Sequence, residues 1–460
     1  MVSYAFISTF RKYINSSILL IGATVLALLA ANLDATRQLY KDLWTLPVNL
    51  SVGEFNLFSH GGQVMSLGTF INDFLMAIFF LSVGLEIKRE FLCGELSSLK
   101  KALLPIIGAC GGMIVPVIVF FIFCGLTTSD PLAERGMAIP MATDIAFSLG
   151  VLSMFSRRVP MGLKIFLAAL AVTDDLGGII VIAIKYTDHI SLNFILGAIA
   201  CIIALIYGNV RQTRSKTFYL SIGIILWYCM LNSGIHATMA GVVLAFCIPA
   251  NLPDGTKFYI ERIRNNIRRF PVIEVSASDR NKPALLNEDD ISILKSVESA
   301  SDHLISPLQD LEDLLKHPIN YFIIPLFAFA NAGVDFTGMS MDNLFTGVGL
   351  AVFLGLLIGK FLGVFSFSWI SIRMKIVEMP KHTDWVSFAS VCMLCGIGFT
   401  VSMFMAELSY GPVERVDLLN DAKLGILCGT VASAVVGSLM LNFSLPKTLE
   451  EEIAEDTAEE

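Results

Sequence analysis

Two adjacent aspartates, Asp174 and Asp175, lie in the middle of an apolar stretch that runs from Gly162 to Tyr186. The stretch is long enough to cross a bilayer as one helix. A carboxylate at the centre of a membrane costs about 2.5–3.5 kcal/mol on insertion scales, so acids found there usually serve a function. A loop between two short buried helices is the alternative, but helix-forming residues continue on both sides. We therefore predict a functional acid pair that lines one aqueous cavity from adjacent angles.

A lysine, Lys360, lies within another long apolar segment. An ammonium group inside a membrane must find a carboxylate or lose its proton. Extension of the side chain towards the headgroups is the alternative. It is disfavoured because apolar residues continue well beyond Lys360 in both directions. If the two helices hold equivalent places in a repeated fold, Lys360 can meet Asp174 or Asp175.

The composition is that of a membrane protein. Hydrophobic residues make up 55% of the chain and charged residues only 16%, whereas a soluble domain usually carries about 25% charge. The net charge of −8 argues against a nucleic-acid partner. The CxxC pair Cys392 and Cys395 falls in an apolar segment without a partner histidine, so we expect no metal, redox site or cofactor there.

Hydropathy predicts an all-α polytopic membrane protein with about twelve spans in a single domain, residues 1–445. The spans are expected near residues 14–33, 68–85, 103–124, 136–155, 162–186, 192–207, 218–231, 237–250, 319–334, 344–370, 386–408 and 424–443. Basic residues in the short connectors number about fourteen on one side and about six on the other, which makes the first side cytoplasmic. Both termini are then cytoplasmic.

One long connector, residues 251–317, is predicted to be cytoplasmic. Arg262, Arg264, Arg268 and Arg269 in its first part could lie on anionic lipid headgroups. Its second part has apolar residues at helical spacing, which favours a surface helix. Residues 446–460 form an acidic cytoplasmic tail that we expect to be disordered.

The fourth and eleventh spans are both interrupted. The fourth contains Pro140, followed closely by Thr143 and Asp144, and the eleventh contains Gly396 and Gly398. A proline in a span frees backbone groups that need a partner or a water-filled cavity. Asp144 could offset the positive ends of half-helices or be a plain N-cap. Because the two spans hold corresponding places in spans 3–5 and 10–12, the pattern predicts inverted repeats with a transport site at mid-membrane.

The segment Val48–Phe58 alternates apolar and polar residues around Gly53, which predicts a β-hairpin outside the membrane. Such a hairpin could join two subunits as a homodimer contact, although an ordered loop is equally compatible with the sequence.

Six motifs together resemble the NhaA family of bacterial sodium/proton antiporters, over residues 14–443. These motifs are INDFLMAIFFLSVGLEIKRE, PMATDIAFSLGVL, LKIFLAALAVTDDLGGI, SGIHATMAGV, IIPLFAFANAGV and LCGIGFTVSMF. The resemblance implies a multi-pass protein of the bacterial inner membrane that is not an enzyme. It implies electrogenic, pH-regulated export of Na⁺ or Li⁺ in exchange for protons, in the service of pH and sodium homeostasis and salt tolerance.

The same resemblance implies roles for the transport residues. Asp175 would be the essential carboxylate for the cation, and Asp174 its partner and the proton carrier, paired with Lys360. Thr143 and Asp144 would sit where the two broken helices cross. The chain departs from the family pattern at Phe361, where the family often has proline. Hard cations prefer oxygen ligands, and protons bind the same carboxylates, so we expect the two ions to compete.

A second group of residues would serve the response to pH. By motif position this group comprises Glu86, Lys88, Arg89, Glu90, His236 and either Glu312 or Asp313. The spacing before Pro318 does not decide between the last two acids. His236 could equally be an interfacial histidine, and Asp73 in the INDFLMA motif is expected to be structural.

Three other classes of protein remain open at this point. An intramembrane aspartyl protease would need acids on two helices and a GxGD motif, whereas Asp175 is followed by Leu and Gly. A sodium-driven organic-anion symporter is disfavoured by Lys360 and the adjacent acids. A passive cation channel would need a run of filter carbonyls.

Overall fold

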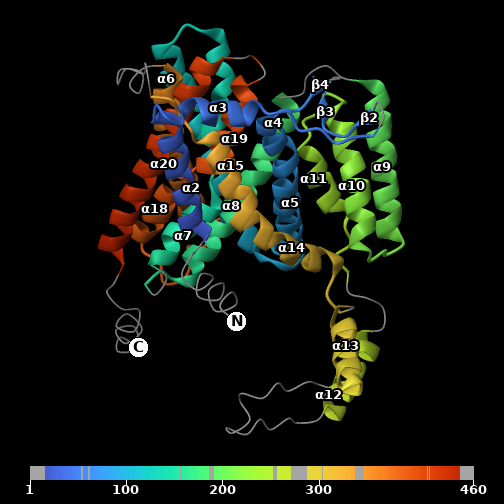
Figure 1. The fold of residues 1–460 in the computed structure, drawn as a ribbon. Helices are drawn as coiled ribbons and strands as arrows, with labels where there is room; N and C mark the ends of the chain where they lie inside the picture. Colours follow the sequence, from blue (N-terminus) through green and yellow to red (C-terminus); the bar gives the residue numbers. More distant parts are fainter. Residues whose placement is uncertain are drawn as a thin grey trace, which may run out of the picture.

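The computed structural model describes residues 16–52, 55–60, 63–155, 158–185, 191–251, 256–270, 287–302, 304–336, 347–411, 413 and 415–445. Within these residues the chain forms a bundle of helices, with two small hairpins at one end and a helical pair at the other (Figure 1). The acidic tail 446–460 lies outside the described residues. So do Arg11, Lys12 and Arg157, which contribute to the charge count.

Six helical stretches in the described residues are long and apolar enough to cross a membrane. They are α4–η1–α5 (Leu67–Phe70, Ile71–Leu75, Met76–Cys93), α6 (Leu99–Thr127), α8 (Met161–Lys185), α9 (Leu192–Val210), α16–η6–α17 (Gly347–Leu354, Gly355–Gly359, Lys360–Arg373) and α20 (Val416–Ser444). Three bent pairs raise the number to as many as nine. The pairs are α2 (Ser16–Asn32) with α3 (Arg37–Thr45), η3 (Pro131–Met141) with α7 (Ile145–Met154), and α18 (Trp385–Leu394) with α19 (Phe399–Tyr410).

Shorter apolar helices complete the bundle. These are α10 (Lys216–Leu231), α11 (Met239–Cys247) and η4–α15 (Ile319–Ile323, Ile324–Asn331), and a short 3₁₀ turn, η2 (Glu95–Ser97), precedes α6. Each of the twelve predicted spans overlaps one of these helices or pairs, which confirms the all-α polytopic fold. The predicted spans 7, 8 and 9 are shorter in the structure than a straight membrane crossing requires.

The order of the elements repeats. A broken pair lies between two unbroken helices twice, first as α6, η3–α7 and α8, and then as α16–η6–α17, α18–α19 and α20. The η3–α7 pair bends by 44° and the α18–α19 pair by 42°. In Figure 1, α7 lies in the lower half of the bundle and α19 in the upper half, so the second halves of the two pairs lie in opposite halves of the bundle. Both predicted breaks are confirmed.

The breaks meet each other and exchange hydrogen bonds. The backbone N–H of Asp144 donates to the carbonyl of Ile397 over 2.7 Å. The hydroxyl of Ser402 in α19 donates over 2.8 Å to the carbonyl of Ile139, which lies in the 3₁₀ segment η3. A backbone that leaves the α-helix inside a membrane must satisfy its polar groups within the protein. The crossing achieves this by pairing the two irregular segments.

The predicted hairpin is also confirmed. Strand β1 (Ser51–Val52) pairs antiparallel with β2 (Phe55–Asn56), and the turn at residues 53–54 lies outside the described residues. A second hairpin, β3 (Ser59–His60) with β4 (Gln63–Val64), follows directly and was not predicted. Both are at the same end of the bundle as α3 (Figure 1).

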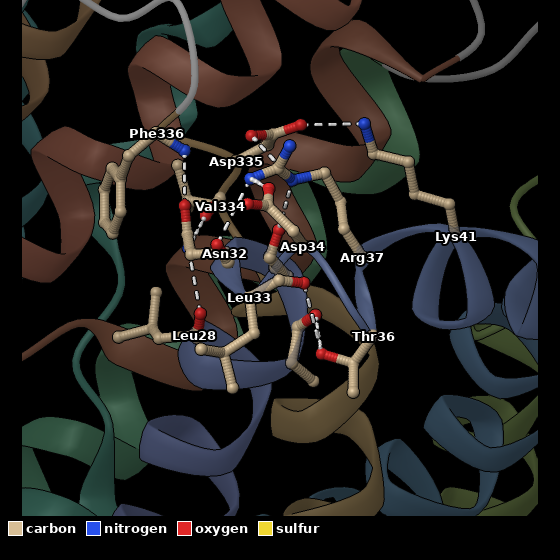
Figure 2. Close-up of polar contacts among 12 residues, drawn as sticks. Leu28, Asn32, Leu33, Asp34, Thr36, Arg37, Lys41, Val334, Asp335 and Phe336 are labelled. Atoms are coloured by element: carbon tan, nitrogen blue, oxygen red, sulfur yellow. Dashed lines mark hydrogen bonds and ion pairs between the residues drawn. The ribbon is translucent and has the colours of Figure 1, made fainter.

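Helix α2 turns by 110° into α3, and hydrogen bonds and an ion pair connect this bend to the chain that follows α15 (Figure 2). The amide of Asn32 donates to the carbonyl of Val334 over 2.7 Å and accepts from the N–H of Phe336 over 2.8 Å. Lys41 pairs with Asp335 over 2.7 Å. These contacts fix one end of α2, which packs along α15.

The described part of the long connector contains three helices, α12 (Thr256–Arg269), α13 (Glu288–Asp302) and α14 (Pro307–Pro318). Helices α12 and α13 pack against each other, and the side chains of Arg262 and Asn266 donate to Ser296 over 3.1 Å and 2.9 Å. Figure 1 shows this pair projecting away from the bundle, while α14 lies against it. The second part of the connector is therefore helical as predicted, but in two pieces.

Candidate ion-binding site

The two aspartates of α8 are buried beside the crossing of the broken helices. Asp174 is 1% exposed and Asp175 is 5% exposed. One carboxylate oxygen of Asp174, Oδ2, lies 2.7 Å from Lys360 Nζ. The same oxygen lies 2.9 Å from the hydroxyl of Thr143 in the first break. The structure therefore brings four of the predicted site residues together and pairs Lys360 with Asp174 rather than with Asp175.

Lys360 is fully buried and held in place by its own helix and its neighbour. It begins α17, directly after the π-helical segment η6, a local irregularity that is frequent at functional sites. Helices α6 and α17 approach closely, since a Cβ atom on Gly111 would lie 2.2 Å from the carbonyl oxygen of Gly363. The ammonium group also donates to the carbonyl of Met141, at the end of η3. Lys360 thus binds both Asp174 and the broken backbone.

Asp144 joins the two half-helices. Its Oδ1 accepts from the N–H of Phe147, so it is the N-cap of α7. Its Oδ2 accepts from both the N–H and the hydroxyl of Thr400, over 3.0 Å and 2.7 Å, at the start of α19. Asp144 therefore fits both interpretations made from the sequence. It is an N-cap, and its one carboxylate also accepts hydrogen bonds at the positive ends of two helices.

A cavity of about 310 Å³ reaches this site, and we name it the acid cavity. Its walls include Asp144, Asp175, Thr400, Glu86 and Glu312. Among the described residues, Asp174 Oδ1 and Asp175 Oδ1 are buried without any hydrogen-bond partner. Buried carboxylate oxygens without donors are costly unless a proton or a cation occupies them. The atoms available to bind a cation here are all oxygens, which fits a hard cation such as Na⁺.

The predicted pH-response residues divide into three places, of which the first is the acid cavity. Glu86 and Glu312 line the acid cavity. Arg89 lies 2.5 Å from Glu312 and 3.1 Å from Glu90. Burial raises the pKa of Glu312 above its usual value, and the nearby Arg89 acts in the opposite direction. Glu86, Arg89, Glu90 and Glu312 thus form one cluster, and all but Glu90 line the acid cavity.

Of the two acids that the sequence left open, Glu312 lines the acid cavity and pairs with Arg89. Asp313, its neighbour on α14, is exposed. Lys88 points elsewhere, because its ammonium donates to the carbonyls of Phe246 and Ile248 over 2.7 Å and 2.5 Å. These carbonyls close the C-terminal end of α11, where a cation is favourable. Lys88 is therefore separate from the Glu86 cluster.

His236 lies in a second cavity of about 420 Å³, which we name the Asp73 cavity. Its Nε2 is 4.0 Å from the carboxylate of Asp73, and its Nδ1 is 2.8 Å from the hydroxyl of Thr238. Asp73 and Glu86 lie at opposite ends of one continuous helical stretch, Leu67–Cys93. His236 and Glu86 were predicted together as pH-response residues. The structure places them in different cavities.

Two features of the site were not predicted. Thr400 was not among the predicted site residues, yet it binds Asp144 twice. The carbonyl of Met141 as a partner of Lys360 could not be read from side-chain types at all. A signal for Thr400 existed in the Gly398-Phe399-Thr400 sequence, since a hydroxyl residue close to a break can donate a hydrogen bond to a nearby carboxylate.

Two crossed broken helices beside a buried carboxylate–lysine pair form the arrangement found in secondary transporters. Sequence comparison agrees: the pattern of the Na⁺/H⁺ antiporter 1 family matches residues 8–441, and the chain belongs to this family. It is 49% identical over 449 residues to the Na(+)/H(+) antiporter NhaA of Phocaeicola vulgatus, covering 97% of each chain. It is 49% identical to the Na(+)/H(+) antiporter NhaA of Bacteroides fragilis, over 94% of this chain and 96% of the relative. It is 42% identical to the Na(+)/H(+) antiporter NhaA of Helicobacter pylori, over 95% of this chain and 96% of the relative.

Proposed function

We propose that this chain is a secondary-active antiporter that exports Na⁺ or Li⁺ in exchange for protons, and so contributes to pH and sodium homeostasis and to salt tolerance. The single observation that carries the proposal is the pair of buried carboxylate oxygens, Asp174 Oδ1 and Asp175 Oδ1, that have no partner among the described residues. The printed names of the relatives support the choice of ions. The exchange uses protein oxygens alone and needs no cofactor.

The exchange works by competition for the same atoms. A cation entering the acid cavity meets Asp175 before Asp174, because Asp175 lines that cavity and Asp174 is held by Lys360 and Thr143. A proton on either carboxylate removes the charge that attracts the cation. Each ion therefore displaces the other, and alternating access follows from movement of one helix bundle against the other.

Electrogenic exchange is the finer part of the proposal. The site holds three groups that can gain or lose a proton, Asp174, Asp175 and Lys360. A cation bound by both carboxylates must compete with Lys360 for Asp174, since these two groups lie 2.7 Å apart. Loss of more than one proton for each cation bound then moves net charge across the membrane.

Regulation by pH is assigned to the cluster of Glu86, Arg89, Glu90 and Glu312. Glu86, Arg89 and Glu312 line the acid cavity, so the charge of the cluster acts on cations that approach Asp175. Lys88 and His236 would act from other positions, Lys88 through the end of α11 and His236 through the Asp73 cavity.

We place the protein in the bacterial inner membrane with both termini in the cytoplasm, on the strength of the basic residues in its connectors. The mouth of the acid cavity then faces the cytoplasm. The hairpin of β1 and β2 is the proposed contact of a homodimer, because it presents short strands at the surface of the bundle.

The test uses everted membrane vesicles from cells that lack their own antiporters. A proton gradient is established, and NaCl, LiCl or KCl is added between about pH 6.5 and 8.5, the range in which a regulated exchanger must respond. We expect Na⁺ and Li⁺ to collapse the gradient and Asp175→Asn to abolish the response. No response to any cation from folded wild-type protein overturns the proposal and favours an organic-anion symporter.

A further inference from the structure

The acid cavity and the Asp73 cavity approach each other along α19. Thr400 and Val401 line the acid cavity, and Phe404 and Glu407 line the Asp73 cavity. Val401 and Phe404 are three positions apart, which corresponds to a rise of about 4.5 Å along a helix. The two cavities are therefore separated by less than one turn on this face of the bundle.

The cavities also approach each other, over a longer distance, along the stretch that leads into α5. Asp73 lines the Asp73 cavity, and Phe79 lines the acid cavity. Their spacing corresponds to a rise of about 9 Å. Two independent helices thus agree that a thin wall divides the cavities.

Aromatic rings fill this wall. Phe404 is fully buried, and Phe80 and Phe327 are 3% and 1% exposed. The ring centroid of Phe404 lies 5.4 Å from that of Phe80 and 6.4 Å from that of Phe327. The imidazole of His236 also packs against Phe404 in an edge-to-face arrangement, with centroids 5.7 Å apart. Apolar constrictions of this kind stop ions because the cation would have to shed its water.

We propose that Phe404 is the gate residue between the two cavities, so that its ring must leave the wall before a monovalent alkali cation can pass from Asp175 to the Asp73 cavity. The proposal rests on the antiport function proposed above. Phe404 lies one turn beyond Thr400, which binds Asp144 in the ion site. The gate and the site therefore share one half-helix, and a movement of α19 changes both together.

Beyond the gate, Asp73 is the acid available to a cation. The other carboxylate of this cavity, Glu407, lies 2.7 Å from Lys423 and is neutralised by it. Arg135 and His236 also line the cavity, so the local charge is balanced rather than strongly negative. A cation that passes Phe404 is thus received by one carboxylate and released readily.

The test measures coupling in liposomes that contain the purified full chain. Efflux of radioactive Na⁺ and uptake of protons are followed together, and their ratio is compared between variants. We expect Phe404→Ala to release Na⁺ faster and to take up severalfold fewer protons for each Na⁺, because the wall no longer excludes the cation. Phe404→Leu keeps an apolar side chain in the wall and is expected to retain the wild-type ratio.

Phe388→Ala is the matched control. Phe388 is as buried as Phe404 but packs with Phe166 and Trp385, away from both cavities. Phe80→Ala, which opens the same wall, replaces Phe404→Ala if that variant does not fold. Folded wall variants with the wild-type ratio overturn the gate, as does an equal loss of coupling in Phe388→Ala. A wild type without sodium-dependent proton uptake instead overturns the proposed function.

Discussion

Lys360 Nζ lies 2.7 Å from Asp174 Oδ2, and both side chains are completely buried. Each charge depends on the other, because an unpaired charge in such a place is strongly unfavourable. The pair also connects the second repeat, which carries Lys360, to the first, which carries Asp174. It is therefore both a structural tie and a part of the ion site.

Removal of the lysine alone should destabilise the protein. We expect Lys360→Ala to cost about 3–5 kcal/mol, the usual range when one partner of a buried ion pair is removed, and to change the pH dependence of exchange. The double variant with Asp174→Asn should recover much of the lost stability, since no unpaired carboxylate remains. Thermal unfolding of purified protein measures the first effect, and vesicle assays the second. A Lys360→Ala protein with wild-type stability and pH profile would show that the pair has no such role.

The hydroxyl of Thr400 gives a narrower test of the crossing. Thr400→Val removes the bond to Asp144 Oδ2 but keeps the shape of the side chain, and should cost about 1.5–3 kcal/mol, as is typical of hydrogen bonds to a charged group. Thr400→Ser keeps the hydroxyl and is the control, expected to resemble the wild type in melting temperature and in apparent affinity for Na⁺. Equal behaviour of the two variants would contradict this view of the crossing.

The burial of Glu312 should make the stability of the folded protein fall as the pH rises. Burial raises its pKa, so the folded protein holds this proton more tightly than the unfolded chain does. The favourable contribution is complete below the ordinary pKa of glutamate and is lost as the pH rises through the folded-state value. Glu312→Gln resembles the protonated acid, and it should match the wild type at low pH and exceed its melting temperature at higher pH. The reverse order at high pH would mean that the ion pair with Arg89 dominates.

Two polar contacts at the bend between α2 and α3 should contribute unequally to stability (Figure 2). Asn32 bonds the backbone of both Val334 and Phe336, and Asn32→Ala should cost about 1–3 kcal/mol because it leaves these groups without their partner. Lys41 is 55% exposed, and Lys41→Ala should cost less than about 1 kcal/mol despite its 2.7 Å ion pair with Asp335. Melting temperatures in detergent compare the two, and a larger loss for Lys41→Ala would contradict this ranking.

Several details of the site were beyond the reach of sequence. The choice between Asp174 and Asp175 as the partner of Lys360 depends on the rotation of α8, because adjacent residues point about 100° apart. The choice between Glu312 and Asp313 depends in the same way on which face of α14 meets the bundle. The division of the pH-response residues between two cavities depends on which helices pack together.

The sequence by itself determined the helical membrane fold, the two broken spans and the residue types of the ion site. These follow from local properties, since hydropathy, proline, glycine and isolated charges act within one segment. Only the tertiary structure decided which oxygen meets which nitrogen, that Asp144 serves two helices, and that Phe404 stands between two cavities. Those relationships join residues far apart in the chain, and they are set by the packing of one helix surface on another.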